Sequence, residues 1–228
     1  MDITAVIPVR AGSTRIKNKN IRPFANSSLL EIKIAQLKQV EYIKTIVVSS
    51  DSDEMLKIAN NNGVMAKKRP KEFCDEQTRT FNDVVQYIAE KQVESEIMMW
   101  VPCVCPMITE QKIAEGIELY MMQQEGKIGG SGVCTARLIK EYLYDEQGPV
   151  NFSVDKHVRS QDLPNWHYIT NGFFIAKTQQ MIDWRFVYGP NPFLFEVNKY
   201  EAIDIDDKYD FEIAEMIFNK HFRNKEGR

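Results

Sequence analysis

The order of short apolar runs and longer amphipathic segments constrains the fold of this chain most. Runs short enough to be buried strands alternate with segments of helical period along most of the sequence. This alternation is typical of βα units, in which helices connect the parallel strands of one sheet. It predicts strands at residues 3–9, 45–50, 96–101, 132–137, 168–176 and 202–205. It predicts helices at residues 29–40, 53–61, 80–91, 110–124 and 209–222. We therefore expect an α/β fold with a mostly parallel sheet flanked by helices.

Residues 139–164 interrupt this order. The segment is polar, contains Gly148-Pro149 and has no helical period. The whole chain has 228 residues, a length that suits one compact α/β domain with a modest extension. We therefore expect a single domain over residues 1–228, into which residues 139–164 are inserted as short strands that form a lid or a dimerisation arm.

Charge and cysteine content restrict the partners and the compartment. The formal net charge of -3 at pH 7 lacks the basic excess of a sequence-independent nucleic-acid binder, so we expect no nucleic-acid partner. No apolar segment approaches the ~18 residues that span a bilayer, and no basic region precedes an apolar run at the N-terminus. We expect a cytoplasmic protein without a membrane partner. The cysteines lack CxxC spacing and a histidine cluster, which predicts free thiols at Cys74, Cys103, Cys105 and Cys134.

Positive charge is concentrated in the loop after the first predicted strand. Ligands of open parallel sheets bind beyond the carboxyl ends of the strands, and this loop usually takes their phosphates. Gly12 would let backbone amides approach an anion closely, and Ser13 adds a short donor. The loop contains neither GxGxxG nor GxxxxGK[ST], so neither a dinucleotide fold nor an NTPase P-loop is indicated. Its cations suit a triphosphate, although a solvated basic loop is the alternative. The cations assigned to the triphosphate are Arg10, Arg15 and Lys19, and Lys17 is the fourth cation of the loop.

Two aspartates alternate near the end of the sequence. Asp204 and Asp206 lie in a stretch that reads as a short strand, so both side chains are expected on one face. Two such carboxylates repel each other unless a cation lies between them, and Mg2+ prefers carboxylate oxygens. The alternative is that one carboxylate caps the last helix while the other is solvated. A cationic loop for a triphosphate and an acidic pair for its metal together indicate nucleotidyl transfer.

Several motifs give the chain a resemblance to the acylneuraminate cytidylyltransferases, which activate sialic acid and related nonulosonates as CMP-sugars. Residues 7–24, IPVRAGSTRIKNKNIRPF, resemble the family motif IPARGGSKRIPRKNIKPF. Residues 47–53 and 68–73 are similar to the family's VVSTDSEE and RRPAEL segments. Residues 160–164 with Asn171-Gly172 resemble its RRQDLP and NG pair, and residues 203–215 resemble its IDID…D…AE ending. The resemblance covers nearly the whole chain.

This resemblance implies a Rossmann-like nucleotidyltransferase fold with CTP as co-substrate and Mg2+ as cofactor. It also implies a homodimer whose arm reaches the active site of the partner. The anomeric hydroxyl of an acidic sugar would attack the α-phosphorus of CTP in line, and pyrophosphate would leave.

The resemblance also assigns roles to individual positions. The catalytic residues would be Arg10, Lys19, Asp204 and Asp206, of which Asp204 and Asp206 would hold the metal. The nucleotide would be bound by Arg10, Ala11, Gly12, Ser13, Arg15, Lys19, Asn20 and Arg69. The acceptor would be bound around Pro102, Gln161, Asn171 and Phe193. Phe193 could instead line a dimer contact. Trp100 is interpreted as a packing residue rather than a stacking platform.

Departures from the family pattern concern the acceptor. Residues 101–107, VPCVCPM, stand where the family has LQPTSPL, so Pro102 replaces a glutamine and can donate nothing. Thr14 replaces a family lysine, and residues 26–29 replace GKPL. The AGSTR pattern is also similar to the 3-deoxy-manno-octulosonate cytidylyltransferases, although their NVQGDEP segment is missing. The acceptor could therefore be a nonulosonate, 3-deoxy-manno-octulosonate, a phosphonate or another small acid. A non-catalytic nucleotide-binding protein is a third interpretation.

Overall fold

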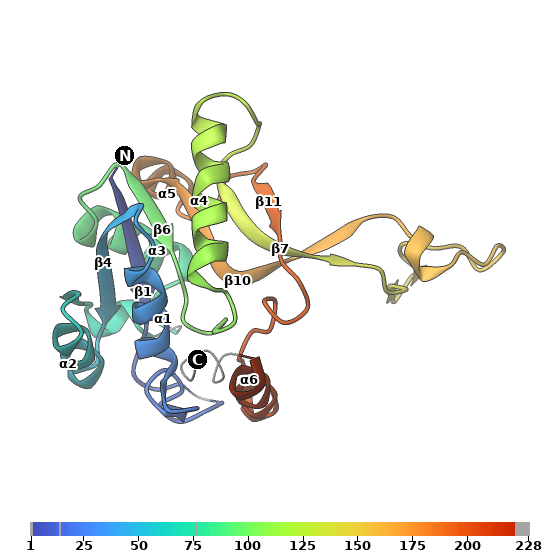
Figure 1. Cartoon of the computed structure of the whole chain (residues 1–228). Helices are drawn as coiled ribbons and strands as arrows, with labels where there is room; N and C mark the ends of the chain where they lie inside the picture. Colours follow the sequence, from blue (N-terminus) through green and yellow to red (C-terminus); the bar gives the residue numbers. More distant parts are fainter. Residues whose placement is uncertain (1, 14, 76, 222–228) are drawn as a thin grey trace.

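The computed structural model describes residues 2–13, 15–75 and 77–221. Its centre is a seven-stranded sheet of order β11-β7-β10-β6-β1-β4-β5 (Figure 1). The strands are β1 Ile3–Pro8, β4 Ile43–Ser50, β5 Met65–Lys68, β6 Ile97–Trp100, β7 Val133–Ile139, β10 Trp166–Lys177 and β11 Phe193–Glu196. Neighbouring strands of this sheet are parallel except β10, which runs antiparallel to β6 and β7. The predicted α/β fold with a mostly parallel sheet is confirmed.

Helices cover both faces of the sheet. One face packs against α1 Leu29–Lys38, α2 Asp53–Asn61, α4 Glu110–Gln124 and α6 Lys208–His221, and the other against α3 Phe81–Gln92 and α5 Thr178–Trp184. Strand β1 shows why both layers are needed, because Ala5 and Ile7 are buried on the first face and Val6 on the second. No helix in the described part of the chain is long and apolar enough to cross a membrane. The four cysteines are free thiols, as predicted.

Short polar residues set where the helices begin. The side chains of Ser28, Ser52, Thr80 and Thr109 each accept a hydrogen bond from the backbone N–H three residues later. Such bonds satisfy amide groups that have no partner inside the helix. They explain why the predicted helices at residues 29–40, 53–61, 80–91 and 110–124 begin within one residue of the observed ones. The predicted helix at 209–222 is α6, and residue 222 lies outside the described residues.

The predicted strand at residues 202–205 is wrong. This stretch has no ladder partner and runs as irregular chain before α6, although Ala202 and Ile205 are buried in the core. The apolar residues of this stretch resemble a strand pattern in the sequence, but they are buried because they hold an irregular segment against the core. The edge of the sheet is formed instead by β11, which pairs in parallel with β7 and was not predicted as a strand. Strand β5 and helix α5 were also missed.

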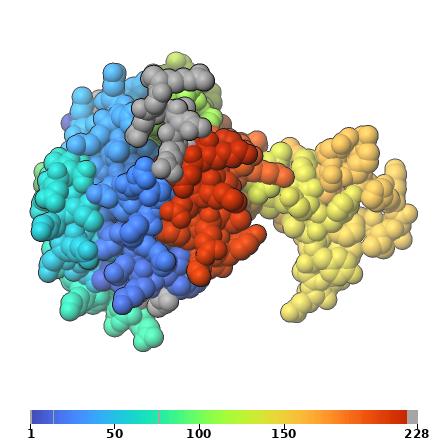
Figure 2. All heavy atoms as spheres, turned by 60° about the horizontal axis from the view of Figure 1, so that its bottom comes forward, coloured from blue at the N-terminus to red at the C-terminus, as the bar shows by residue number. Residues whose placement is uncertain are grey.

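The chain between β7 and β10 leaves the body of the molecule as an arm, residues 140–165 (Figures 1 and 2). It contains a two-stranded hairpin of β8 Tyr144–Asp145 and β9 Gly148–Pro149, and a 3-10 turn at Ser160–Asp162. Tyr142 packs edge-on against Phe152 inside the arm, with ring centroids 5.1 Å apart. Tyr144 and Val154 remain 70% and 74% exposed. The arm therefore presents apolar side chains away from the core of its own chain.

Lys33 of α1 is completely buried, and this burial should make the free energy of unfolding depend on pH. Burial lowers the pKa of Lys33 to about 8, although the thiols of Cys103 and Cys105 and the carboxylate of Glu110 oppose the shift. The ammonium group of Lys33 therefore loses its proton at lower pH in the folded protein than in the unfolded chain. The contribution of Lys33 to the free energy of unfolding is largest above pH 10.5 and is lost as the pH falls from 10.5 to about 8. We expect the unfolding free energy of the wild type, relative to Lys33→Met, to rise by about 3 kcal/mol between pH 7 and pH 10.5.

Denaturant titrations at several pH values would measure this difference. Groups that titrate alike in both proteins cancel in it. Lys38→Met, on the same helix but at an exposed position, should give a flat difference. A flat difference for Lys33→Met as well would contradict the prediction.

Candidate active site

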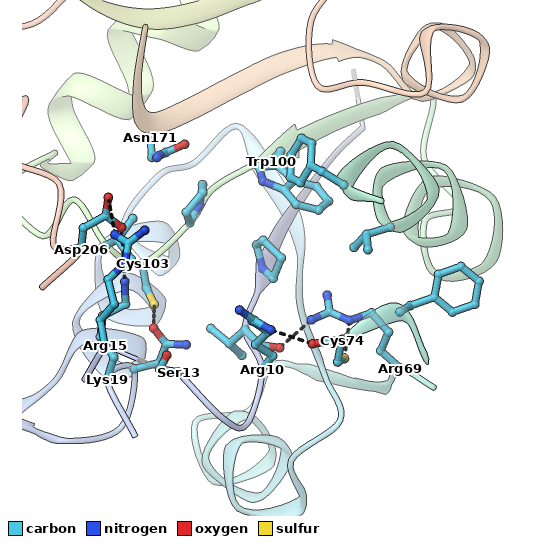
Figure 3. A pocket seen from close by; sticks show the side chains of 18 of the residues that line it. Arg10, Ser13, Arg15, Lys19, Arg69, Cys74, Trp100, Cys103, Asn171 and Asp206 are labelled. Atoms are coloured by element: carbon cyan, nitrogen blue, oxygen red, sulfur yellow. Dashed lines mark hydrogen bonds and ion pairs between the residues drawn. The ribbon is translucent and has the colours of Figure 1, made fainter. Parts of the chain in front are cut away.

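A cavity of about 480 Å³ lies at the carboxyl ends of β1 and β6 (Figure 3). Strand β1 has β4 on one side and β6 on the other, so the strand order reverses here. Open α/β sheets bind ligands at such a point. The lining comes from the loop after β1, from residues 69–84, from loop 101–109 between β6 and α4, from β10, and from the segment before α6.

The loop after β1 supplies most of the positive charge in the cavity. Lining side chains from this loop include Arg10, Ser13, Arg15, Lys19 and Asn20. Ala11 and Gly12 are exposed in the same loop and lie outside the lining. Gly12 has φ 77°, a left-handed conformation that favours glycine, and the Ala11 N–H donates to Oδ1 of Asp51 at 2.8 Å. Thr14 lies outside the described residues.

The acidic segment before α6 contacts this cationic loop directly. Nζ of Lys19 donates to the carbonyl oxygen of Ile205 at 2.5 Å and lies 4.0 Å from Oδ1 of Asp206. Nη1 of Arg15 is 3.3 Å from Oδ2 of Asp206. Two segments from opposite ends of the sequence thus meet at one cavity, although the predicted strand beneath the aspartates is absent.

Asp204 is the most enclosed carboxylate of the cavity. Nδ2 of Asn171 donates to its Oδ2 at 2.5 Å, whereas Oδ1 is buried without a hydrogen-bond partner in the described part of the chain. Burial raises the pKa of Asp204, the bond from Asn171 opposes this shift, and the nearby charge of Asp206 reinforces it. A carboxylate oxygen without a donor is a suitable ligand for a hard cation such as Mg2+.

The donor set around Asp204 decides what kind of metal site could exist. Within residues 2–13, 15–75 and 77–221, no group of three or more His, Cys, Asp or Glu side chains is placed to hold a metal. A Mg2+ ion usually binds one or two carboxylates and completes its shell with water and substrate phosphates. Asp204 and Asp206 therefore fit Mg2+ that arrives with a nucleotide, rather than an ion held by the protein alone.

A bulge in β10 presents Asn171 to Asp204. The pairing of β10 with β7 shifts register between Ile169 and Phe174. Inside the bulge, Oγ1 of Thr135 accepts from the N–H groups of Gly172 (3.1 Å) and Phe173 (3.2 Å). A Cβ atom on Gly172 would lie 2.8 Å from Oγ1 of Thr135, so a larger residue would clash with it. The Asn-Gly pair inside a strand pattern is the sequence signal for this bulge.

Arg69 anchors the opposite wall and is only 3% exposed. Its Nη2 donates to the carbonyl oxygen of Val9 at 2.8 Å, and its Nε donates to Sγ of Cys74 at 2.9 Å. Nη1 of Arg10 donates to the carbonyl oxygen of Cys74 at 2.9 Å. The segment after β5 is therefore fixed to the end of β1 by two guanidinium groups (Figure 3).

Loop 101–109 forms a wall with few polar side chains. Pro102 and Val104 line the cavity and offer no donor, while Sγ of Cys103 donates to Oδ1 of Asn20 at 3.3 Å. Trp100 also lines the cavity, but it is 3% exposed and packs edge-on against Phe81 with ring centroids 5.6 Å apart. This corner of the cavity is therefore mainly apolar.

Sequence reasoning missed several lining residues and placed others there that lie elsewhere. Asp75, Arg79 and Phe81 line the cavity from the segment after β5. The rule that sites form beyond strand ends would have found this segment if β5 had been predicted. Gln161 is exposed in the arm, and Phe193 pairs with Val133 in β11, so neither lines the cavity of its own chain.

Comparisons with known proteins agree on one activity. A family model described as Cytidylyltransferase matches residues 4–156. Pseudaminic acid cytidylyltransferase of Campylobacter jejuni subsp. jejuni serotype O:23/36 (strain 81-176) is 24% identical over 219 residues, 93% of this chain and 94% of that protein. N-acylneuraminate cytidylyltransferase of Escherichia coli O18:K1:H7 (strain RS218 / NMEC) is 25% identical over 226 residues, 98% of this chain and 54% of that protein.

The fold also has a close counterpart among solved structures. CMP:2-keto-3-deoxy-manno-octonic acid synthetase, solved in complex with CTP, matches with a TM-score of 0.69 and 14% identity. The match covers 97% of this chain and 100% of that one. At this level of identity the likeness shows the fold.

Proposed function

Because the chain belongs to the cytidylyltransferase family, as a nucleotidyltransferase of the acylneuraminate type, we propose that it transfers CMP from CTP to a sialic-acid-like nonulosonate and releases pyrophosphate. The contact between the cationic loop after β1 and the acidic segment before α6 carries this proposal. Lys19 bonded to Ile205, and Arg15 paired with Asp206, bring the groups that suit a triphosphate to the groups that suit its metal.

The cavity supports a direct displacement at phosphorus. The anomeric hydroxyl of the acceptor forms a bond to the α-phosphorus of CTP, and the bond from that phosphorus to the bridging oxygen breaks. The hydroxyl proton passes to solvent, and pyrophosphate carries away the electron pair of the broken bond. Arg10, Arg15 and Lys19 bind the triphosphate and stabilise the charge that spreads over its oxygens in the transition state.

The remaining roles follow from position in the cavity. Asp204 and Asp206 would hold Mg2+, which when bound neutralises phosphate charge. Asn171 orients Asp204 through its hydrogen bond. Asn20, in the loop after β1, would lie near the nucleotide. Arg69, which donates to the carbonyl oxygen of Val9, would contact the base or the phosphates. Ala11 and Gly12, on the exposed part of the loop, would approach the nucleotide through their backbone.

A different acidic acceptor is the second candidate, and the wall of loop 101–109 favours it. Pro102 and Val104 give the cavity no side-chain donor for a sugar carboxylate or hydroxyl. The same CTP machinery could then serve 3-deoxy-manno-octulosonate, a phosphonate or another small acid. A protein that binds nucleotide without catalysis is the third candidate.

Incubation with CTP, Mg2+ and a panel of acids tests these alternatives. We expect pyrophosphate release with at least one nonulosonic acid. Turnover with another acid alone would replace the acceptor and keep the reaction. Tight CTP binding without turnover on any acid of the panel would remove the nonulosonate assignment and leave the nucleotide site.

We further propose that the chain forms a homodimer through the arm, so that Gln161 and its neighbours reach the cavity of the partner. Support comes from the projection of the arm and from its exposed apolar side chains, including Tyr144. Large surface apolar groups of this kind are typical of protein interfaces.

We expect Tyr144→Asp to weaken dimerisation by at least about tenfold, because a charge would replace a ring that the proposed interface would bury. Analytical ultracentrifugation over a concentration series would measure the change. Tyr209→Asp is the matched control, because Tyr209 on α6 is 71% exposed and Tyr144 is 70% exposed. A monomeric wild type, or equal effects of both substitutions, would contradict the arm as the interface.

A further inference from the structure

Helix α1 binds loop 101–109 through three side-chain hydrogen bonds from inside the core. Nζ of Lys33 donates to the carbonyl oxygens of Cys105 at 3.2 Å and Ile108 at 3.4 Å. Nε2 of Gln36 donates to the carbonyl oxygen of Pro106 at 2.8 Å. Lys33 is 0% exposed and Gln36 is 7% exposed. Buried polar groups at these positions satisfy backbone oxygens that face away from water.

Loop 101–109 in turn connects the two halves of the cavity. Sγ of Cys103 bonds to the side chain of Asn20, and the carbonyl oxygen of Val104 accepts from the N–H of Ile205 at 3.0 Å. Lys19 also joins the cationic loop directly to the acidic segment, because its Nζ donates to the carbonyl oxygen of Ile205. The position of this loop therefore helps to fix the acidic segment relative to the cationic loop.

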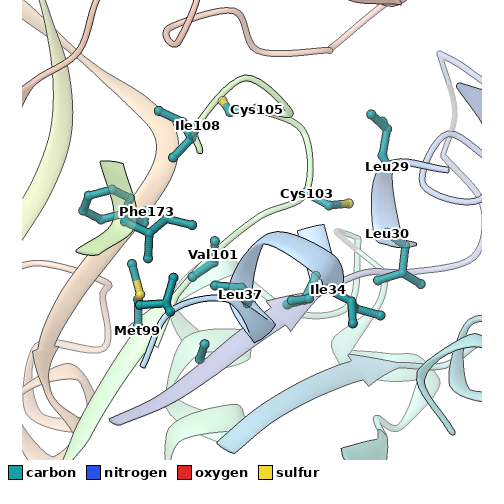
Figure 4. Close-up of a cluster of buried hydrophobic side chains, with 14 of the residues drawn as sticks. Leu29, Leu30, Ile34, Leu37, Met99, Val101, Cys103, Cys105, Ile108 and Phe173 are labelled. Atoms are coloured by element: carbon teal, nitrogen blue, oxygen red, sulfur yellow. The ribbon is translucent and has the colours of Figure 1, made fainter. Parts of the chain in front are cut away.

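Apolar packing alone does not set that position. Figure 4 shows Leu29, Leu30, Ile34 and Leu37 of α1 in the same buried cluster as Val101, Cys103, Cys105 and Ile108. Such contacts are non-directional. Hydrogen bonds depend on direction as well as distance, so bonds to three nearby carbonyl oxygens fix the position of the loop relative to α1. A helix N–H also fixes Asn20, because Leu30 N–H donates to its carbonyl oxygen at 2.9 Å.

We propose that Lys33 and Gln36 are positioning residues for the transfer reaction, which set the placement of loop 101–109 and thereby the distance between bound nucleotide and acceptor. The inference rests on the proposed function of the cavity. Neither side chain lines the cavity, so both act through the loop and not on a substrate. Arg10 and Arg69 are anchored to Cys74 and Val9, and the Leu30 N–H that holds Asn20 is a backbone group, so binding of the nucleotide should not depend on the side chains of Lys33 and Gln36.

The test compares Lys33→Met and Gln36→Leu with Lys38→Met as a matched control. Lys38 is on the same helix and its Nζ also donates to a backbone carbonyl oxygen, that of Asn62 at 2.7 Å, away from the cavity. For the two positioning variants we expect kcat/KM for the acceptor to fall by at least about tenfold, while the Kd for CTP changes by less than about threefold. Hydrogen exchange of loop 101–109 should become faster in both. The control should match the wild type in every measurement.

Retention of kcat/KM within about twofold by both variants, with unchanged exchange of the loop, would overturn the inference. If Lys33→Met does not fold, Gln36→Leu carries the test, because it removes only the bond to Pro106. If the wild type turns over no acceptor, the proposed function fails instead. In that case faster exchange of loop 101–109 in the variants, with unchanged CTP binding, still supports positioning by α1, and unchanged exchange overturns it.

Discussion

Asp204→Asn is expected to yield a folded protein that releases pyrophosphate at least about 10³-fold more slowly than the wild type. Asparagine keeps the shape of the side chain, and its oxygen can accept the hydrogen bond from Asn171. It cannot supply the negative charge that binds a cation. Because burial already raises the pKa of Asp204, loss of the charge should not destabilise the fold. Pyrophosphate release and the melting temperature measure the two effects separately.

Glu201→Gln is the matched control for this loss of one carboxylate. Glu201 accepts a hydrogen bond from Asn198 N–H in the turn before the acidic segment and does not line the cavity. The variant should retain wild-type activity. Asp204→Asn activity above about a tenth of the wild-type rate would remove Asp204 from the catalytic set. A wild type without activity on any acid would favour the non-catalytic alternative.

Lys19→Met is expected to weaken CTP binding by about 10²-fold. The side chain of Lys19 is only 14% exposed, so its charge is poorly screened by water. The substitution removes a cation for the triphosphate and also the bond to the carbonyl oxygen of Ile205 that joins the two halves of the cavity. Titration calorimetry with CTP and Mg2+ would measure the change in Kd.

Lys17→Met provides the comparison within the same loop. Lys17 is exposed and does not line the cavity, so its loss should change the Kd for CTP by less than about threefold. Equal effects of the two substitutions would show that the loop attracts CTP only through its total charge. The specific placement of Lys19 against Ile205 would then have no role in binding.

The parts of the fold that sequence reasoning predicted correctly are those with local signals. Ser52 and Thr109 mark helix starts through their own side chains, and the apolar run of β1 indicates a strand buried on both faces. The fold class follows from these signals. The cationic loop around Lys19 and the aspartate pair at Asp204 and Asp206 predicted that both ends of the chain contribute to one site, and these residues line one cavity.

The missed parts depend on contacts between distant residues. Strand β5 is short and carries two lysines, so only its pairing with β4 makes it a strand. Without β5, the sequence could not show that Arg79 and Phe81 reach the cavity. The polar character of Lys33 likewise predicts an exposed position, and its burial follows only from the carbonyl oxygens that face it. Alternation at residues 202–205 could not distinguish a ladder strand from an anchored irregular segment.

Strand β10 connects the arm to the central sheet. Its first residues pair with β7 at the base of the arm, its last residues pair with β6 inside the sheet, and Asn171 lies between the two pairings. A displacement of the arm can reach the body along this strand only by passing the bulge that orients Asn171. Because Asn171 donates to Asp204, we expect movement of the arm to change the orientation of the Asp204 carboxylate through this one stretch of backbone.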